Sequence, residues 1–184
     1  VNREHSFPKS WFKEGQPMKS DAFHVYPTDG KVNGQRSNFP YGECANGTTL
    51  PSSNGVDALG KLGKSTFPGY SGTVFEPVDE YKGDFARSYF YMAACYNDKI
   101  ASWSSPMLAG NSYPCYTTWA VNLLLKWNEQ DPVSQKEIDR NNAVYKNQNN
   151  RNPFIDHPEL AEYIWGDKQN IGWTPGGVVD PKIT

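Results

Sequence analysis

Residues 116–128 read YTTWAVNLLLKWN and form the most strongly patterned stretch of the chain. Four apolar residues recur there at positions i, i+3, i+4 and i+7: Ala120, Leu123, Leu124 and Trp127. This spacing places the four side chains along one face of an α-helix. The sequence therefore predicts a helix from about residue 116 to 128 whose apolar face is buried in the core.

Three further segments have helical patterns. Residues 83–97 place aromatic and apolar side chains at near-helical spacing, with Asp84 at the start, where a carboxylate suits the helix dipole. The run Asp131-Pro132-Val133-Ser134 predicts a helix start, because Pro suits a first turn and Ser134 with Glu137 forms a capping-box pair. That helix should reach about residue 146, end in Asn-rich text and Pro153, and be followed by a short helix over 158–165.

The first half of the chain has a different character. Residues 1–56 contain prolines spaced through polar text, with short extended runs such as 22–26, and predict short strands and turns. Residues 46–64 are rich in Gly, Ser, Thr and Asn and predict an exposed loop or hairpin, the part of the chain most prone to disorder. Residues 167–184 read as an irregular tail. The expected fold class is α+β within a single domain over 1–184, with strands and loops first and several helices in the second half.

Composition excludes several classes of protein. With 184 residues the chain can bury a sizeable core, and 14% aromatic residues argue against intrinsic disorder. The formal net charge of −2 provides no global positive field for nucleic acid, so a polyanion site would have to be local. No apolar run approaches the ~20 residues of a membrane helix, and the first five residues contain no targeting signal. Three cysteines allow at most one disulfide.

Histidine suits general-base chemistry near neutral pH, and the chain has only three: His5, His24 and His157. His157 sits at an expected helix entry, where a structural role is the simpler reading. Glu4 abuts His5, and in an extended stretch the two side chains point to opposite sides and take separate tasks around one site.

A second polar run covers residues 21–38 and combines His24 with three side-chain amides, Arg36 and two glycines. A surface loop could have the same composition, and Asn33-Gly34 could form a tight turn. Residues 1–40 carry six basic and four acidic residues, a mild positive excess that permits phosphate binding.

Together these motifs resemble the bacterial endonuclease I family, which comprises secreted or periplasmic non-specific nucleases. The resemblance rests on Arg3-Glu4-His5-Ser6-Phe7-Pro8, on residues 21–38 with their Val32-Asn33-Gly34-Gln35-Arg36-Ser37-Asn38 end, and on the aromatic segment 83–92. It runs in order from about residue 2 to 165. It implies an α+β fold with a ββα-metal, or His-Me finger, core. Family members usually carry a helical segment before the Glu-His motif, so we expect this chain to begin inside the domain.

The resemblance implies roles for matching positions only. His5 falls where the family has its general base, Glu4 where it has a carboxylate metal ligand, and Asn33 where it has an amide ligand. Many relatives carry His at the position of Phe23 and Asn at that of His24, so the role of His24 is open. Two oxygen ligands plus waters suit magnesium, whereas manganese or another transition metal gains ground if His24 reaches the cation. The implied reaction is hydrolysis of DNA, and of RNA as a further option, to 5′-phosphate and 3′-hydroxyl ends.

Basic residues are the candidates for holding the phosphate backbone, which a non-specific nuclease grips in place of base edges. The candidates are Arg36, Lys31, Arg151, Arg87 and Arg140. Arg87 and Arg140 lie on expected helices, where pairing with nearby acids is an equally good explanation.

Two other functions compete with the nuclease. One is a secreted module that binds polysaccharide or nucleic acid on exposed Trp and Tyr without catalysis, and the other is an inactive relative that still binds nucleic acid. Convergence of Glu4, His5 and Asn33 on one site would favour the nuclease. The sequence has no signal for oligomeric state, and an extracellular or periplasmic location follows from the resemblance alone.

Overall fold

The computed structural model describes residues 1–55 and 58–176. It has an α+β fold, as predicted. The strands are β1 (Asn2–His5), β2 (Val25–Thr28), β3 (Thr48–Pro51), β4 (Ala58–Lys64) and β5 (Thr73–Glu76). The helices are α1 (Gly30–Arg36), α2 (Lys82–Cys95), α3 (Thr118–Gln130), α4 (Gln135–Gln148), α5 (Pro153–Asp156) and α6 (Leu160–Ile164). Short 3₁₀ turns occupy Lys9–Phe12, Met18–Ser20, Ala22–His24, Asp79–Tyr81 and Ile100–Ser102.

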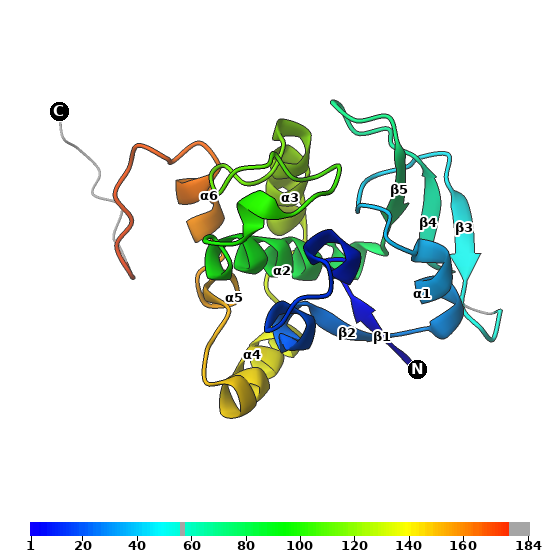
Figure 1. The fold of residues 1–184 in the computed structure, drawn as a ribbon, viewed down its shortest axis with the longest axis horizontal. Coiled ribbons are helices and arrows are strands. Elements are labelled where there is room, and N and C mark those ends of the chain that lie inside the picture. The colour runs from blue at the N-terminus through cyan, green and yellow to red at the C-terminus, as the bar shows by residue number, and fades with distance from the viewer. Residues whose placement is uncertain (56–57, 177–184) are drawn as a thin grey trace.

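Helix α2 is the central element of the fold, with α3 and α5 packed against it, whereas α1 packs against strands β1, β3 and β4 (Figure 1). The predicted helices over 83–97 and 116–128 are confirmed as α2 and α3. The apolar face predicted for α3 is buried: Ala120, Leu123, Leu124 and Trp127 are inaccessible to solvent. Helix α2 is buried nearly all round, because it packs against α3 on one side and against α5 and the N-terminal turns on others. Aromatic side chains provide much of this core, as the composition indicates.

Helix α4 begins as the sequence predicts, but Pro132 does not lie in its first turn. Ser134 is the N-cap, and its side chain and that of Glu137 form the predicted capping box. Pro132 lies two residues before the cap, so the helix starts later than a first-turn proline would place it. Pro153 does not simply end a helix either, because it starts α5 behind an Asn152 cap. The short helix expected over 158–165 is confirmed as α6.

The N-terminal half contains a helix that the sequence analysis missed. Strands β1 and β2 pair antiparallel, with Glu4 opposite Tyr26 and His5 opposite Val25, and α1 follows directly. We expected a turn or loop there, because two glycines lower the helix propensity of a seven-residue segment. The Asp29 side chain accepts two backbone N–H bonds at the N-terminus of α1. Burial of one face of the helix then supplies the stability that its low helix propensity does not.

The remaining strands form a separate sheet in the order β3-β4-β5, at the right in Figure 1. Of the loop or hairpin predicted within 46–64, the structure shows the hairpin, because β3 pairs antiparallel with β4. Residues 56–57 lie outside the described residues. Residues 167–176 contain no helix or strand, and the rest of the expected tail, 177–184, is not described.

The cysteines are free thiols in this structure. Cys44 and Cys115 are buried and Cys95 is exposed, so the single disulfide that the sequence allows is not formed. No helix within 1–55 and 58–176 is long and apolar enough to cross a membrane.

Candidate functional site

Strand β1 ends with the two residues that the sequence analysis singled out. Glu4 is buried, and its carboxylate receives a charge-assisted hydrogen bond from the Arg36 guanidinium on α1. Burial raises the pKa of Glu4, and the positive charge of Arg36 opposes that shift. The ion pair therefore connects the end of β1 to the last turn of α1.

Arg36 is too deeply buried to serve as the phosphate contact that the sequence suggested. Only 2% of the residue is exposed, and its guanidinium donates to the carbonyls of His5 and Ser6 as well as to Glu4. It also lies 4.5 Å from the centre of the Tyr41 ring. Both terminal nitrogens of its guanidinium donate to protein acceptors, so Arg36 holds β1 against α1.

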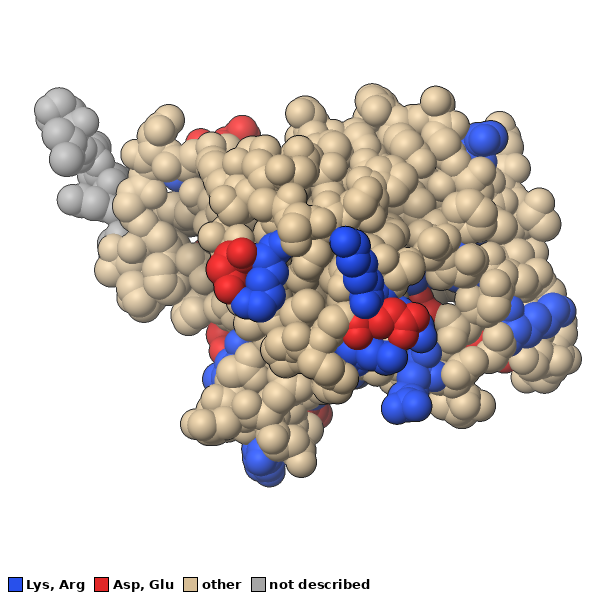
Figure 2. Space-filling model, in the orientation of Figure 1, with Lys and Arg blue, Asp and Glu red and all other residues tan. Residues whose placement is uncertain are grey.

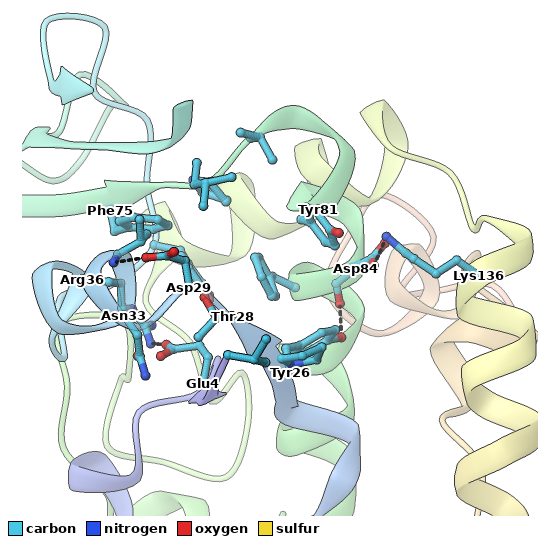
Figure 3. Close-up of a pocket in the computed structure, with 18 of the residues that line it drawn as sticks. Glu4, Tyr26, Thr28, Asp29, Asn33, Arg36, Phe75, Tyr81, Asp84 and Lys136 are labelled. Carbon is cyan, nitrogen blue, oxygen red and sulfur yellow. Dashed lines mark hydrogen bonds and ion pairs between the residues drawn. The ribbon is translucent and has the colours of Figure 1, made fainter. Parts of the chain in front are cut away.

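Asn33 lies beside Glu4, and both residues line one cavity of about 630 Å³ (Figure 3). Its amide nitrogen donates to the Arg3 carbonyl at 3.3 Å, which leaves the amide oxygen Oδ1 free to accept or to ligate. A carboxylate oxygen and an amide oxygen are hard ligands of the kind that Mg²⁺ takes together with water. The donor chemistry of Glu4 and Asn33 therefore fits a hard divalent cation.

His5 lies next to this pair but on the other face of β1. Its Nε2 is 2.9 Å from the Lys19 carbonyl oxygen. A carbonyl only accepts, so Nε2 carries the proton of the neutral ring and Nδ1 is left with its lone pair. His5 is half-buried and is not among the residues that line the cavity shared by Glu4 and Asn33. The structure thus brings Glu4 and Asn33 together and places His5 one residue away, facing a different side.

His24 does not reach the Glu4 and Asn33 pair. It is fully buried, its Nε2 donates to the Met18 carbonyl at 2.6 Å, and its ring lies 5.4 Å from that of His5. The two imidazoles therefore hold consecutive carbonyls, those of Met18 and Lys19, in one 3₁₀ turn. His24 supports the turn that orients His5, which agrees with a structural role at this position.

The burial of His24 predicts a pH dependence of stability. Desolvation lowers its pKa to about 4, below the 6.5 of a free histidine, so the folded state favours the neutral ring. This contribution is complete above pH 6.5 and is lost as the pH falls towards 4, because the unfolded chain binds the proton first. We expect the free energy of unfolding to fall by about 2 kcal/mol between pH 7 and pH 5 from this group alone.

Urea unfolding of the wild type and of His24→Asn at pH 7, 6 and 5 gives the free energy of unfolding of each protein. The difference between the two proteins measures the contribution of the His24 titration. Asn keeps a side-chain amide that can donate a hydrogen bond, and it does not titrate in this range. The difference should shrink as the pH falls. A difference that stays constant from pH 7 to 5 would show that His24 is not held neutral by burial.

The other predicted phosphate contacts are scattered. Lys31 is exposed at the start of α1, and no acidic side chain in the described part of the chain pairs with it. Arg140 lines the same cavity as Asn33 and donates to the carbonyls of Ala22 and Val25. Arg140 therefore lies near the end of β1, where Val25 pairs with His5, whereas Lys31 follows the end of β2 that pairs with Asn2 at the start of β1.

Arg87 and Arg151 are committed to carboxylates. Arg87 is fully buried and makes two hydrogen bonds of 2.7 and 2.6 Å to Glu137, so of its two explanations the structure favours helix packing. Arg151 makes two hydrogen bonds of 2.7 Å to Asp156 in the segment after α4. A phosphate would have to displace Asp156 to bind there.

The sequence analysis missed Arg3 as a cationic residue of the site. It is exposed, lies two residues before His5 and therefore shares the same face of β1. Its carbonyl holds the Asn33 amide. Strand periodicity was a signal that could have found it, because i and i+2 project together.

Acidic and basic side chains are mixed on the face of the molecule where the N-terminal turns lie (Figure 2). Lys9 and Lys19 both pair with Glu14 there. Within the described residues no cluster of three His, Cys, Asp or Glu side chains is placed to hold a metal ion. A cation at Glu4 and Asn33 would therefore keep most of its positions for water or substrate oxygens.

The antiparallel β1–β2 pair and the helix α1 that follows it carry a carboxylate, an amide and an imidazole, groups of the kind that hydrolytic sites use. The comparison with known proteins makes the assignment more specific. The family model described as Endonuclease I matches residues 1–159, and the chain belongs to this family.

Individual relatives agree with this assignment. An extracellular ribonuclease of Bacillus amyloliquefaciens is 38% identical over 178 residues, which cover 89% of this chain and 53% of the relative. An endonuclease-1 of Buchnera aphidicola is 29% identical over 144 residues, 76% of this chain and 47% of the relative. An extracellular deoxyribonuclease of Aeromonas hydrophila is 27% identical over 139 residues, 76% of this chain and 50% of the relative. The chain thus spans about half the length of these relatives.

Proposed function

We propose that this protein is a metal-dependent endonuclease that hydrolyses phosphodiester bonds in DNA and RNA with little sequence specificity. The observation that carries the proposal is that Glu4 and Asn33 line one cavity, with His5 directly after Glu4 on the other face of β1, in a chain of the endonuclease I family. The relatives include proteins named as ribonucleases and as deoxyribonucleases, which supports both polymers as substrates.

The β1–β2–α1 unit is the candidate ββα-metal core. Glu4 and Asn33 would hold a divalent cation, and their two oxygen ligands suit magnesium best. When bound, such a cation stabilises the negative charge that develops on the phosphoryl and leaving oxygens. A transition metal would be favoured if the His24 imidazole supplied a third ligand. His24 instead donates its Nε2–H to the Met18 carbonyl and does not reach the pair, so this condition is not met.

His5 is the proposed general base. With the proton on Nε2 held by the Lys19 carbonyl, Nδ1 is the atom that takes a proton from the attacking water. Attack of this water on phosphorus and cleavage of the bond to the 3′-oxygen give 5′-phosphate and 3′-hydroxyl ends. The hydrogen bond from Nε2–H to the Lys19 carbonyl fixes the tautomer and the orientation of the ring, as the carboxylate does for the histidine of hydrolase triads.

Substrate is held through its backbone in this proposal. Arg3 shares the face of His5, and Lys31, two residues before Asn33 on α1, forms no ion pair with any described residue. Contacts to phosphate position the polymer without reading its sequence. Relatives are named as extracellular or periplasmic enzymes, and we infer the same location for this protein.

Asn33→Ala tests the metal site with little effect on folding, because the side chain makes one long hydrogen bond and is half-buried. We expect plasmid nicking to need at least about tenfold more Mg²⁺, since loss of even an indirect metal contact costs 10–100-fold in affinity. The measurement is initial nicking rate against MgCl₂ concentration, with EDTA as the blank.

Gln35→Ala on the exposed side of α1 is the matched control and should keep the wild-type Mg²⁺ curve. If Asn33→Ala also keeps that curve, Asn33 is not a metal ligand. If the wild type nicks plasmid equally well in EDTA, the metal-dependent mechanism is wrong.

A further inference from the structure

The cavity that Glu4 and Asn33 line extends beyond the proposed catalytic site. Its volume of about 630 Å³ falls within the ~300–1,000 Å³ of typical ligand pockets. The proposed metal ligands occupy one side, and the opposite side is built from β2 and the start of α2 (Figure 3). Metal ligation and phosphate binding do not account for this second side.

That second side is aromatic. Phe85 lies at its centre, with the Tyr26, Tyr41 and Tyr81 rings at 5.1, 4.7 and 6.0 Å from it. All four residues line the cavity, and Phe85, Tyr26 and Tyr81 keep part of their surface open to solvent. Aromatic faces of this kind stack nucleobases regardless of sequence.

Charged groups at the same cavity suit a nucleotide. Lys136 places its ammonium 3.9 Å from the centre of the Tyr81 ring, and the Arg140 guanidinium lies 4.1 Å from that of Tyr26. Asp84, only 2% exposed, also lines the cavity, and its Oδ1 accepts no hydrogen bond from the described residues. Lys136 pairs with the Asp84 Oδ2 at 3.0 Å, so a phosphate would compete with that carboxylate for its ammonium. The cavity thus offers aromatic rings, the Arg140 guanidinium near the Tyr26 ring, and the Asp84 Oδ1 as an acceptor for the N–H groups of a base.

We propose that this cavity receives one unpaired nucleobase of the strand whose phosphate lies at Glu4 and Asn33, so that single-stranded nucleic acid is cleaved in preference to duplex. The inference rests on the proposed nuclease function. A base in a duplex would first have to leave its pair and its stack, which disfavours duplex substrates. A base in a single strand enters without that cost.

Tyr81→Ala tests the proposal by removing one aromatic wall. The substrates are a fluorescein-labelled single-stranded oligonucleotide and a hairpin that contains the same sequence as duplex. We expect kcat/KM on the single strand to fall about tenfold through KM, with the hairpin changed less than twofold. Tyr81→Phe keeps the ring and should retain the wild-type ratio.

The matched control is Tyr145→Ala on α4. Tyr145 is 47% exposed and has the Arg151 guanidinium over its ring, but it does not line the cavity. It should leave both substrates unchanged. Thermal unfolding of every variant shows whether the protein remains folded.

Competitive inhibition distinguishes binding of the base from binding of the phosphate. Adenosine and uridine monophosphates should inhibit the wild type, and their inhibition constants should rise at least fivefold in Tyr81→Ala, while inhibition by inorganic phosphate stays the same.

Equal loss on the single strand and the hairpin, or an unchanged ratio in folded Tyr81→Ala, overturns the base site. A drop in melting temperature with no change in the ratio also overturns it and assigns the cavity wall to packing. If neither substrate is cleaved by the wild type with any divalent metal, the nuclease function itself fails. If the wild type cleaves the single strand and the hairpin equally well, this inference is wrong and the proposed nuclease function stands.

Discussion

His5→Ala should lower kcat for plasmid nicking by about 10²–10⁴-fold, the usual contribution of a general base. The residue is half-buried at the end of β1 and makes one hydrogen bond, to the Lys19 carbonyl, so its removal should cost little stability. Loss of rate with an intact fold is therefore the expected signature. The measurement is the initial rate of supercoiled plasmid nicking in saturating MgCl₂, with thermal unfolding alongside.

His157→Ala is the matched control for this variant. His157 has an exposed side chain near Glu159, far along the chain from β1, and it should keep the wild-type rate. His5→Ala should also leave the affinity for uncleaved oligonucleotide within a few-fold of wild type. If His5→Ala nicks plasmid at more than a tenth of the wild-type rate, His5 is not the base, and catalysis must be assigned to another group.

Glu137→Ala should destabilise the protein by about 3–5 kcal/mol, because it leaves the fully buried Arg87 guanidinium without its anion. Glu137 also accepts the backbone N–H of Ser134 in the capping box, so the start of α4 loses a partner as well. Asp84 lies 3.7 Å from Arg87 and offsets part of the loss. Burial and the charge of Glu137 raise the pKa of Asp84 to about 6 in the wild type. Glu137→Ala removes the second cause, so Asp84 should stay ionised to a lower pH in the variant and keep its offset there.

Urea denaturation measures this effect, with Asp139→Ala as the control from the exposed side of the same helix. The control should change the free energy of unfolding by less than about 0.5 kcal/mol. Glu137→Gln keeps an acceptor for Arg87 and Ser134 without the charge, and we expect it to fall between the two. A loss below about 1 kcal/mol for Glu137→Ala would mean that the Arg87 ion pair contributes little beyond its replacement by water.

Much of the fold was predictable because it depends on local patterns. Helix α3 follows from apolar residues repeating on one helical face, and α4 follows from Ser134 and Glu137, whose capping interaction spans three residues. The missed helix α1 is the opposite case. Its glycines argue against a helix, and the burial of Val32 and Arg36 against distant segments decides its conformation.

The candidate site was likewise predictable only where it depends on residues close together in the sequence. Adjacency in the sequence placed Glu4 and His5 on opposite faces of one strand, and the family resemblance named Asn33 as their partner. No pattern in the sequence indicated that Arg36 would form an ion pair with Glu4, 32 residues away, or that Arg87 would pair with Glu137, 50 residues away. Both arginines carry a charge that would suit phosphate, and only their burial removes them from that role.

The sequence by itself determined the helices of the second half and the capping of α4, because these depend on neighbours within a few positions. The family resemblance added Glu4, His5 and Asn33 as candidate site residues. The tertiary structure alone decided which candidate cations are paired with carboxylates, that His24 holds the Met18 carbonyl beside His5, and that aromatic residues of β2 and α2 line one cavity with Glu4. The physical reason is that desolvation and pairing of charged groups depend on segments that meet only when the core packs.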